Sequence, residues 1–374
     1  MHRGLAPGLD RALSVLDRHD PDAGRRLEAW CRVVLAAPAA RDAASPAPWR
    51  DTRLNTRPEP VELSLGWPDD GLRATFDLAA RAAAPPDRLA QALACVREAD
   101  PAAARDGGAL ASFAALQRHG PLDWGAWLGV RWRADGTARA KVYAEVPRTA
   151  PPDELDRWLR ARLGARPAVP PQARLLLVGA TPGDALCECY FECPRGPDTS
   201  GSRDSRDSHD SHDSGESDES RDARGLHDWG DWRDWDRLLR AAGIDGEAQG
   251  LFPLMRRFDG REPRPERGPP AAWAGFSLAG TPDGRVHKAA VLATVARLAG
   301  GEAGLRRQIL ALVQRQGGAL PLYDALTTPL RALHRADGFH NLLSCSAAVG
   351  TPAGWQIAFC PPPCLADAAS PDRP

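Results

Sequence analysis

Three polar side chains of different chemistry alternate with small apolar residues in the stretch ARAKVYAEVP, residues 138–147. Lys141, Tyr143 and Glu145 share one face of a predicted strand, because successive side chains of a strand point to opposite sides. A lysine can bind an anion, a tyrosine ring can stabilise a cation, and a carboxylate can accept a proton. One such strand is also typical of a solvated outer face. A functional interpretation therefore requires that other strands repeat the pattern.

Other segments do repeat it. VELSLGW (61–67), LRATFDLA (72–79) and LCECYFEC (186–193) each alternate polar residues with apolar ones. The polar positions of these segments are Glu62, Ser64, Arg73, Thr75, Asp77, Glu188, Tyr190 and Glu192. The pattern predicts several strands that each have one apolar and one polar face.

These strands belong to a unit that recurs along the chain: a strand, a turn with glycine, a second strand and, in four of the five cases, a helix. The units cover residues 61–98, 127–163, 173–243, 273–316 and 341–362. Turns such as PDDG, ADG and TPDG are typical of hairpins. Ten antiparallel strands in five hairpins predict an α/β (α+β) fold in which a closed barrel is surrounded by helices, since closure removes exposed strand edges. Polar residues would then face the barrel interior, although the fourth and fifth units do not show which residues point inward.

The composition is that of one globular domain, residues 1–374, with a barrel core of about 25–362. Residues 195–225 consist of Ser, Asp and Arg with few apolar residues, so we predict a disordered insertion there and a disordered tail at 363–374. The net charge of -1 indicates no affinity for nucleic acid or membrane surfaces, and a cytoplasmic location is expected because no signal or membrane-spanning segment is present. The eight cysteines include no C-x-x-C pair, which favours buried thiols over a zinc site.

PVELSLGW followed by LRATFDLA is similar to the first repeat of the indole-type aromatic prenyltransferases, the dimethylallyltryptophan synthase family of the ABBA or PT-barrel fold, including its bacterial members. The resemblance implies that Glu62 accepts a hydrogen bond from the indole N–H and that Arg73 binds diphosphate. KVYAEVP resembles the second-repeat K-x-Y strand of that family, which implies roles for Lys141 and Tyr143.

The later repeats depart from the family pattern. The third repeat of the family usually brings a cation before its tyrosine, whereas Glu188 precedes Tyr190 here. The fourth repeat offers His287 or Lys288 and no tyrosine, and the fifth offers Phe359 or Trp355. The expected site thus consists of Glu62 as the catalytic residue, Arg73, Lys141 and His287 as diphosphate-binding residues, and Tyr143, Tyr190 and Phe359 as the shield of an allylic cation.

The resemblance implies a metal-independent transferase that moves a dimethylallyl or longer prenyl group to an indole or tryptophan-derived acceptor in alkaloid or other secondary metabolism. The prenyl diphosphate is a co-substrate, no cofactor is required, and the protein is expected to be a monomer or homodimer. The acidic run Asp228, Asp231 and Asp234 is interpreted as a helix start, since no facing cluster completes a magnesium site.

Two alternatives remain open. One is a catalytically weakened barrel that binds an aromatic or isoprenoid ligand, which the altered later repeats favour. The other is an unrelated α/β repeat protein that binds other proteins, with the Ser/Asp/Arg-rich insertion as a docking segment.

Overall fold

The computed structural model describes most of the chain. The described residues are 7–35, 52–68, 71–80, 84–99, 108–132, 137–164, 169–170, 173–193, 232–244, 250–259, 273–298, 300–333 and 338–363. The predicted disordered insertion, and the predicted tail apart from Pro363, lie outside them.

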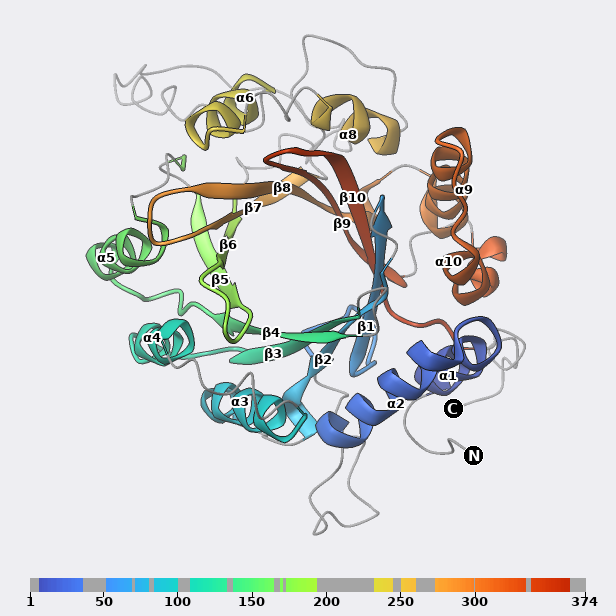
Figure 1. Ribbon diagram of the computed structural model, residues 1–374, viewed down its shortest axis with the longest axis horizontal. Helices are drawn as coiled ribbons and strands as arrows, with labels where there is room; N and C mark the ends of the chain where they lie inside the picture. The colour runs from blue at the N-terminus through green and yellow to red at the C-terminus, as the bar shows by residue number, and fades with distance from the viewer. Residues whose placement is uncertain are drawn as a thin grey trace, which may run out of the picture.

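Ten antiparallel strands close into a barrel, which Figure 1 shows end-on. Each strand pairs with its neighbours in the sequence, and β1 pairs with β10 to complete the ring. The strands are β1 (Val61–Trp67), β2 (Arg73–Asp77), β3 (Ala126–Trp132), β4 (Ala138–Glu145), β5 (Arg174–Ala180), β6 (Cys187–Glu192), β7 (Trp273–Gly280), β8 (Val286–Thr294), β9 (His340–Ala348) and β10 (Thr351–Phe359). The barrel expected from the five hairpins is therefore confirmed.

The last hairpin has a tight turn. Only Val349 and Gly350 separate the end of β9 at Ala348 from the start of β10 at Thr351. Gly350, with a φ of 69°, provides the left-handed residue of this turn. Strand β10 pairs with β9 from the turn to Phe359, with a bulge near each end.

Helices surround the barrel on its outside (Figure 1). They are α1 (Pro7–His19), α2 (Pro21–Leu35), α3 (Arg88–Ala99), α4 (Gly108–Gln117), α5 (Pro152–Leu163), α6 (Trp232–Ala241), α8 (Leu251–Asp259), α9 (Gly301–Arg315) and α10 (Pro321–Leu326). Short 3-10 helices occupy 78–80, 85–87, 295–297 and 328–332. In the described part of the chain, no helix has the length and apolar character needed to cross a membrane.

Helix α5 shows how local sequence sets these boundaries. Its first turn contains Asp153 and Glu154 and its last turn Arg160 and Arg162, so the charges complement the helix dipole at both ends. The helix ends at Gly164, which has a φ of 67°. A side chain there would also collide with the backbone of the β7–β8 turn, because a Cβ on Gly164 would lie 2.3 Å from the backbone nitrogen of Gly284.

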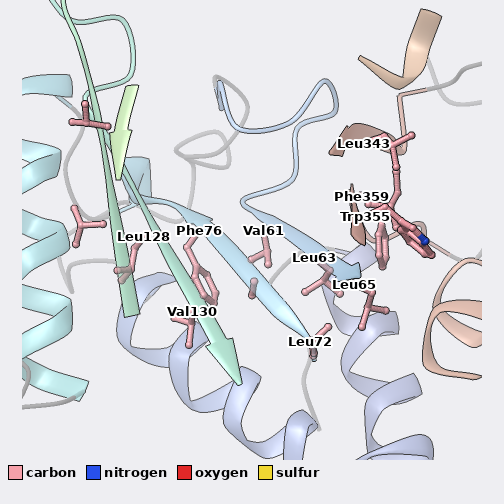
Figure 2. Close-up of a cluster of buried hydrophobic side chains, with 14 of the residues drawn as sticks. Val61, Leu63, Leu65, Leu72, Phe76, Leu128, Val130, Leu343, Trp355 and Phe359 are labelled. Atoms are coloured by element: carbon pink, nitrogen blue, oxygen red, sulfur yellow. The ribbon is translucent and has the colours of Figure 1, made fainter. Parts of the chain in front are cut away.

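The hydrophobic core lies between the strands and the helices. Figure 2 shows part of it, where apolar side chains of several strands extend from the outer face of the barrel. Val61, Leu63 and Leu65 of β1 are at most 1% exposed. Burial of such side chains contributes roughly 1.5–3 kcal/mol each relative to exposure. Seven of the eight cysteines lie in the described residues, and all seven are buried free thiols, as predicted.

A buried polar network joins this core to β9. The His340 Nδ1 atom lies 2.5 Å from a Glu302 carboxylate oxygen, and its Nε2 atom lies 2.9 Å from the Tyr323 hydroxyl. Glu302 also accepts backbone N–H hydrogen bonds from Phe339 and His340. The network thereby links α9 and α10 to the start of β9 through groups that are all hydrogen-bonded.

Candidate functional site

The register of the strands determines which side chains lie inside the barrel. Glu62 pairs with Thr75, and Ser64 pairs with Arg73. Paired residues of neighbouring strands share a face, so these polar side chains lie opposite the face of the buried leucines of β1. The same argument places the polar residues of β4 and β6 on the inner face, through the pairing of Gly179 with both Tyr143 and Glu188.

Glu62 lies on the inner face at the start of β1. Its carboxylate accepts a 2.9 Å hydrogen bond from the Asn341 side chain of β9. Asn341 donates a second hydrogen bond, of 2.6 Å, to the Asn55 side chain. Burial raises the pKa of Glu62 to about 7, although the Asn341 hydrogen bond opposes that change. A carboxyl group that titrates near neutral pH is suited to accept a hydrogen bond or a proton from a substrate.

Lys141 and two tyrosines form the centre of the site. The Lys141 ammonium lies 4.9 Å from the centre of the Tyr143 ring and 5.4 Å from that of Tyr190. The two rings meet edge to face with their centres 6.0 Å apart. The Tyr190 hydroxyl accepts a 3.2 Å hydrogen bond from Lys141. The structure thus brings together three of the predicted site residues, with both aromatic rings within the range of cation–π contacts.

Glu188 is the acidic member of this cluster. One carboxylate oxygen accepts a hydrogen bond from Lys141 and the other a 2.8 Å bond from the Ser277 hydroxyl of β7. Burial acts to raise the pKa of Glu188, but the charges of Lys141 and Lys288 outweigh it and lower the pKa to about 2. Glu188 in turn raises the pKa of Lys141 against the effect of burial. Both groups are therefore charged at neutral pH.

Arg73 enters the site from β2. It donates a hydrogen bond to the side chain of Gln356 on β10, which itself donates a 2.9 Å bond to the Ser64 hydroxyl. Burial lowers the pKa of Arg73, while the neighbouring Glu188 acts in the opposite direction. The guanidinium is held by β10 and stays near the carboxylate and the tyrosines.

The fourth repeat supplies Lys288 to the interior. Lys288 pairs with Ala279, which pairs in turn with Glu188, so the lysine shares the inner face with the carboxylate. Burial lowers the pKa of Lys288, and the positive charges of Arg73 and Lys141 contribute to the decrease. Among the described residues the side chain of Lys288 makes no hydrogen bond or ion pair, although its backbone pairs with β7 and β9.

His287, the residue expected from this repeat, lies elsewhere. Its Nε2 atom is 3.0 Å from the Thr281 hydroxyl at the β7–β8 turn. The pairing of β7 with β8 shifts register between Ala279 and Gly280, so His287 falls where the ladder is irregular. The structure does not bring His287 to the cation cluster, and Lys288 takes the inward position.

Phe359 does not line the interior, so its expected inward placement is wrong. It pairs with Leu63 and is fully buried on the outer face of the barrel. Its ring packs edge to face against Tyr323 of α10, with the ring centres 5.8 Å apart. Trp355, the alternative, also points outward and packs against Phe258 of α8. Where β10 pairs with β1, its inward residues are Gln356 and Ala358, so this part of the fifth repeat adds no aromatic ring to the site.

Two glycines make room for the central side chains. A Cβ on Gly129 would lie 2.8 Å from the Tyr143 ring, and one on Gly179 would lie 2.7 Å from the Lys141 side chain. Either distance is shorter than real Cβ contacts allow, so larger residues at these positions would displace Tyr143 or Lys141. Sequence patterns alone did not identify these glycines, because their role depends on the pairing of β3, β4 and β5.

Glu145, the third polar residue of ARAKVYAEVP, has a structural role. Its carboxylate accepts backbone N–H hydrogen bonds from Asp123 (3.0 Å), Trp124 (2.7 Å) and Gly125 (2.7 Å). It is buried at the end of β4 and holds the loop that leads into β3. Only the first two polar residues of the stretch therefore belong to the cluster.

The chemistry of the cluster is that of an anion site beside aromatic rings. Cationic side chains from β2, β4 and β8 surround a single carboxylate, Glu188, and a second carboxyl group, Glu62, lies on the neighbouring strand β1. In the described part of the chain, no group of three or more His, Cys, Asp or Glu side chains could hold a metal ion.

The chain matches no family model and no curated protein. It is similar in structure to 5-dimethylallyltryptophan synthase from Streptomyces coelicolor in complex with DMASPP and Trp, with a TM-score of 0.64 and 16% identity over 98% of this chain and 95% of that chain. The 6-dimethylallyltryptophan synthase from Micromonospora olivasterospora gives a TM-score of 0.63 and 17% identity over 95% and 97%. PriB in complex with product diphosphate gives 0.67 and 16% over 97% and 96%. The chain therefore has the ABBA prenyltransferase barrel fold, which it shares with bacterial dimethylallyltryptophan synthases.

Proposed function

We propose that the protein is an aromatic prenyltransferase that transfers a dimethylallyl group from dimethylallyl diphosphate to the indole ring of tryptophan or a tryptophan derivative. The observation that supports this most strongly is the arrangement inside the barrel. A carboxyl group with a pKa near 7, two tyrosine rings and three cations lie on the inner face of one barrel. The similar structures from S. coelicolor and M. olivasterospora contain DMASPP and Trp, which correspond to the donor and the acceptor of this proposal.

In this proposal the cations act on the donor. Arg73, Lys141 and Lys288 hold the diphosphate and stabilise the charge that develops on it when the bond between the allylic carbon and oxygen breaks. Positive side chains supply the stabilisation that a divalent metal supplies in other diphosphate sites, so we propose that no metal is required. Tyr143 and Tyr190 stabilise the allylic cation through their ring faces and keep water from it.

Glu62 acts on the acceptor. Its carboxylate accepts a hydrogen bond from the indole N–H and stabilises the positive charge that the ring acquires when one of its carbons attacks the allylic cation. Loss of the proton from that ring carbon restores aromaticity, and diphosphate leaves as the second product. Asn341 and Asn55 position the carboxylate for this role.

A second candidate is a barrel that binds an aromatic or isoprenoid ligand with weakened catalysis. The observation that favours it is the ion pair between Glu188 and Lys141, which offsets one of the three cations. The retained Glu62 and Arg73 oppose it, because a binding protein has no need for a carboxyl group adjusted to pH 7.

A product assay distinguishes the two candidates. The purified protein is incubated with dimethylallyl diphosphate and a panel of indoles, tryptophan and tryptophan dipeptides in the presence of EDTA, and mass spectrometry measures the gain of one prenyl group. The transferase predicts a prenylated product that is lost in Glu62→Gln and in Arg73→Ala. Binding of tryptophan or the donor without product with any acceptor would support the second candidate.

A further inference from the structure

Glu188 is a carboxylate at the centre of a cluster whose other charged members are positive. Both of its oxygens are occupied, one by Lys141 and one by the Ser277 hydroxyl. The charges of Arg73 and Lys288 act on the same carboxylate. An anionic ligand that binds these cations must compete with Glu188 for Lys141 and is repelled by its charge.

A purely structural role does not explain this residue. Glu188 accepts no hydrogen bond from any backbone N–H in the described residues, in contrast to Glu145, whose carboxylate holds three. The side chains of Lys141 and Glu188 keep 23% and 14% of their surface exposed, so neither charge is sealed from solvent. In a largely buried ion pair the cost of desolvation offsets much of the attraction between the charges, so the pair is weak evidence for a role in stability.

We propose that Glu188 sets the affinity of the donor site: it competes with the diphosphate for Lys141 and thereby limits how tightly diphosphate is held. This inference rests on the proposed function for the identity of the anion. When diphosphate binds, Lys141 transfers its hydrogen bond from Glu188 to a phosphate oxygen, while Lys288 needs no such exchange because it has no ion pair in the described structure. After transfer, Glu188 recovers Lys141 and favours release of inorganic diphosphate.

The test measures binding of inorganic diphosphate by calorimetry. Glu188→Gln removes the charge and retains a group that can bond to Ser277, so we expect it to bind diphosphate about tenfold more tightly, which corresponds to about 1.4 kcal/mol. In a Lys141→Met background Glu188 no longer competes with diphosphate for Lys141, so we expect Glu188→Gln to change the diphosphate affinity by less than about threefold. Glu192→Gln is the matched control, because Glu192 lies on the same strand, is exposed and pairs with Arg174. Its effect should be below about twofold.

A kinetic measurement adds a second readout. If release of diphosphate becomes slower in Glu188→Gln, product forms in a rapid first turnover and the steady rate then falls below that of the unaltered protein. Glu188→Asp keeps the charge but withdraws it from Lys141 by one methylene, and we expect its diphosphate affinity to lie between those of the unaltered protein and Glu188→Gln. If Glu188→Gln does not fold, the Glu188→Asp variant is used in its place.

Unchanged or weaker diphosphate binding in Glu188→Gln, or in Glu188→Asp where that variant replaces it, would overturn the inference. An equal gain in diphosphate affinity with and without Lys141 would also overturn it, because Glu188 would then act only as a distant charge. The absence of diphosphate binding by the unaltered protein would overturn it as well. The proposed function is judged separately, by formation of the prenylated product. The expected order of diphosphate affinities without product would retain the role of Glu188 in an anion site while the transferase proposal fails.

Discussion

Two polar clusters of this protein combine the same kinds of groups in different surroundings. Inside the barrel, a carboxylate, an ammonium and a phenol meet in Glu188, Lys141 and Tyr190. Between the barrel wall and the helices, a carboxylate, an imidazole and a phenol meet in the network around His340. Both connect segments that are far apart in the sequence.

The two clusters differ in exposure and in the balance of their charges. Glu302 and His340 are completely buried, and two backbone N–H groups complete the hydrogen bonds of the carboxylate. The inner cluster keeps access to solvent and contains more positive than negative charge. A closed network with every group satisfied stabilises the fold, whereas a cluster with excess charge and partial exposure can bind an anion.

The largest expected effect is the effect on catalysis of a substitution inside the barrel, at Glu62. Glu62→Gln removes the carboxylate that we propose to bind the acceptor but keeps the size of the side chain, so we expect kcat to fall by about 10²–10⁴-fold. Steady-state assays with mass-spectrometric detection of product measure this. The midpoint of thermal unfolding should change little, because Asn341 can still hydrogen-bond to the amide. A variant with full activity would show that Glu62 has no catalytic role.

A smaller effect, on stability, is expected in the outer network. Glu302→Ala leaves two backbone N–H groups and the His340 ring without an acceptor in a fully buried site, which lowers the free energy of unfolding by about 3 kcal/mol. Glu188→Ala should lower it by a smaller amount, because it leaves no backbone N–H group without an acceptor and the Lys141 ammonium keeps partial access to solvent. Urea denaturation of both variants makes the comparison. Equal losses would contradict the division into a stabilising and a binding cluster.

Two adjacent residues of the fourth repeat, His287 and Lys288, test which positive side chains of the inner cluster bind diphosphate. Lys288→Met removes an inward cation, and we expect diphosphate affinity to fall about tenfold or more. His287→Gln alters a side chain that bonds to Thr281 at the turn, so its effect should stay below about twofold. Calorimetric titration with inorganic diphosphate gives both values, and the reverse order would restore His287 to the donor site.

A change of about the same size is expected from pH. Because the pKa of Glu62 is raised to about 7, the ionised fraction, and with it kcat/KM, should rise about tenfold between pH 6 and pH 8. Glu188 has a pKa of about 2 and does not titrate in this range. A rate that is flat across this interval would place the catalytic ionisation elsewhere.

Stability should change with pH in the opposite direction. The pKa of Glu62 in the folded protein lies above its usual value of 4.5, so the folded state binds more protons between about pH 4.5 and 7 and the free energy of unfolding falls as pH rises through this interval. Glu59 has the same raised pKa and adds to the slope. Denaturation of Glu62→Gln across this interval should show a smaller slope than the unaltered protein, and an unchanged slope would contradict the assignment.

The predictable part of the site lies on strands that alternate strictly between polar and apolar residues. In β1, β2, β4 and β6 alternation predicts that the polar residues face the interior, and the family resemblance singles out Glu62, Arg73, Lys141, Tyr143 and Tyr190 among them. The structure places all five on the inner face. Alternation predicts their face because an apolar face must pack against helices, which leaves the other face to the interior.

The unpredictable part lies on β8 and β10. HKAAVLA is apolar at almost every position, and WQIAF has large aromatic residues at positions that turned out to face the helices. A shift of one residue reverses which side chains face inward, and bulges at the ends of these strands create such shifts. His287 and Phe359 were therefore assigned to the interior incorrectly, and Lys288 was not chosen.

Local patterns in the sequence were sufficient to predict the ten strands, their arrangement in hairpins and the polar face of the early repeats, because turns and alternation are local properties of the chain. The tertiary structure alone decided the partners of each charge: that Glu188 holds Lys141, that Gln356 holds Arg73, and that two glycines leave space for Tyr143 and Lys141. These contacts join residues of different strands, and only the closure and register of the barrel bring such strands to bonding distance.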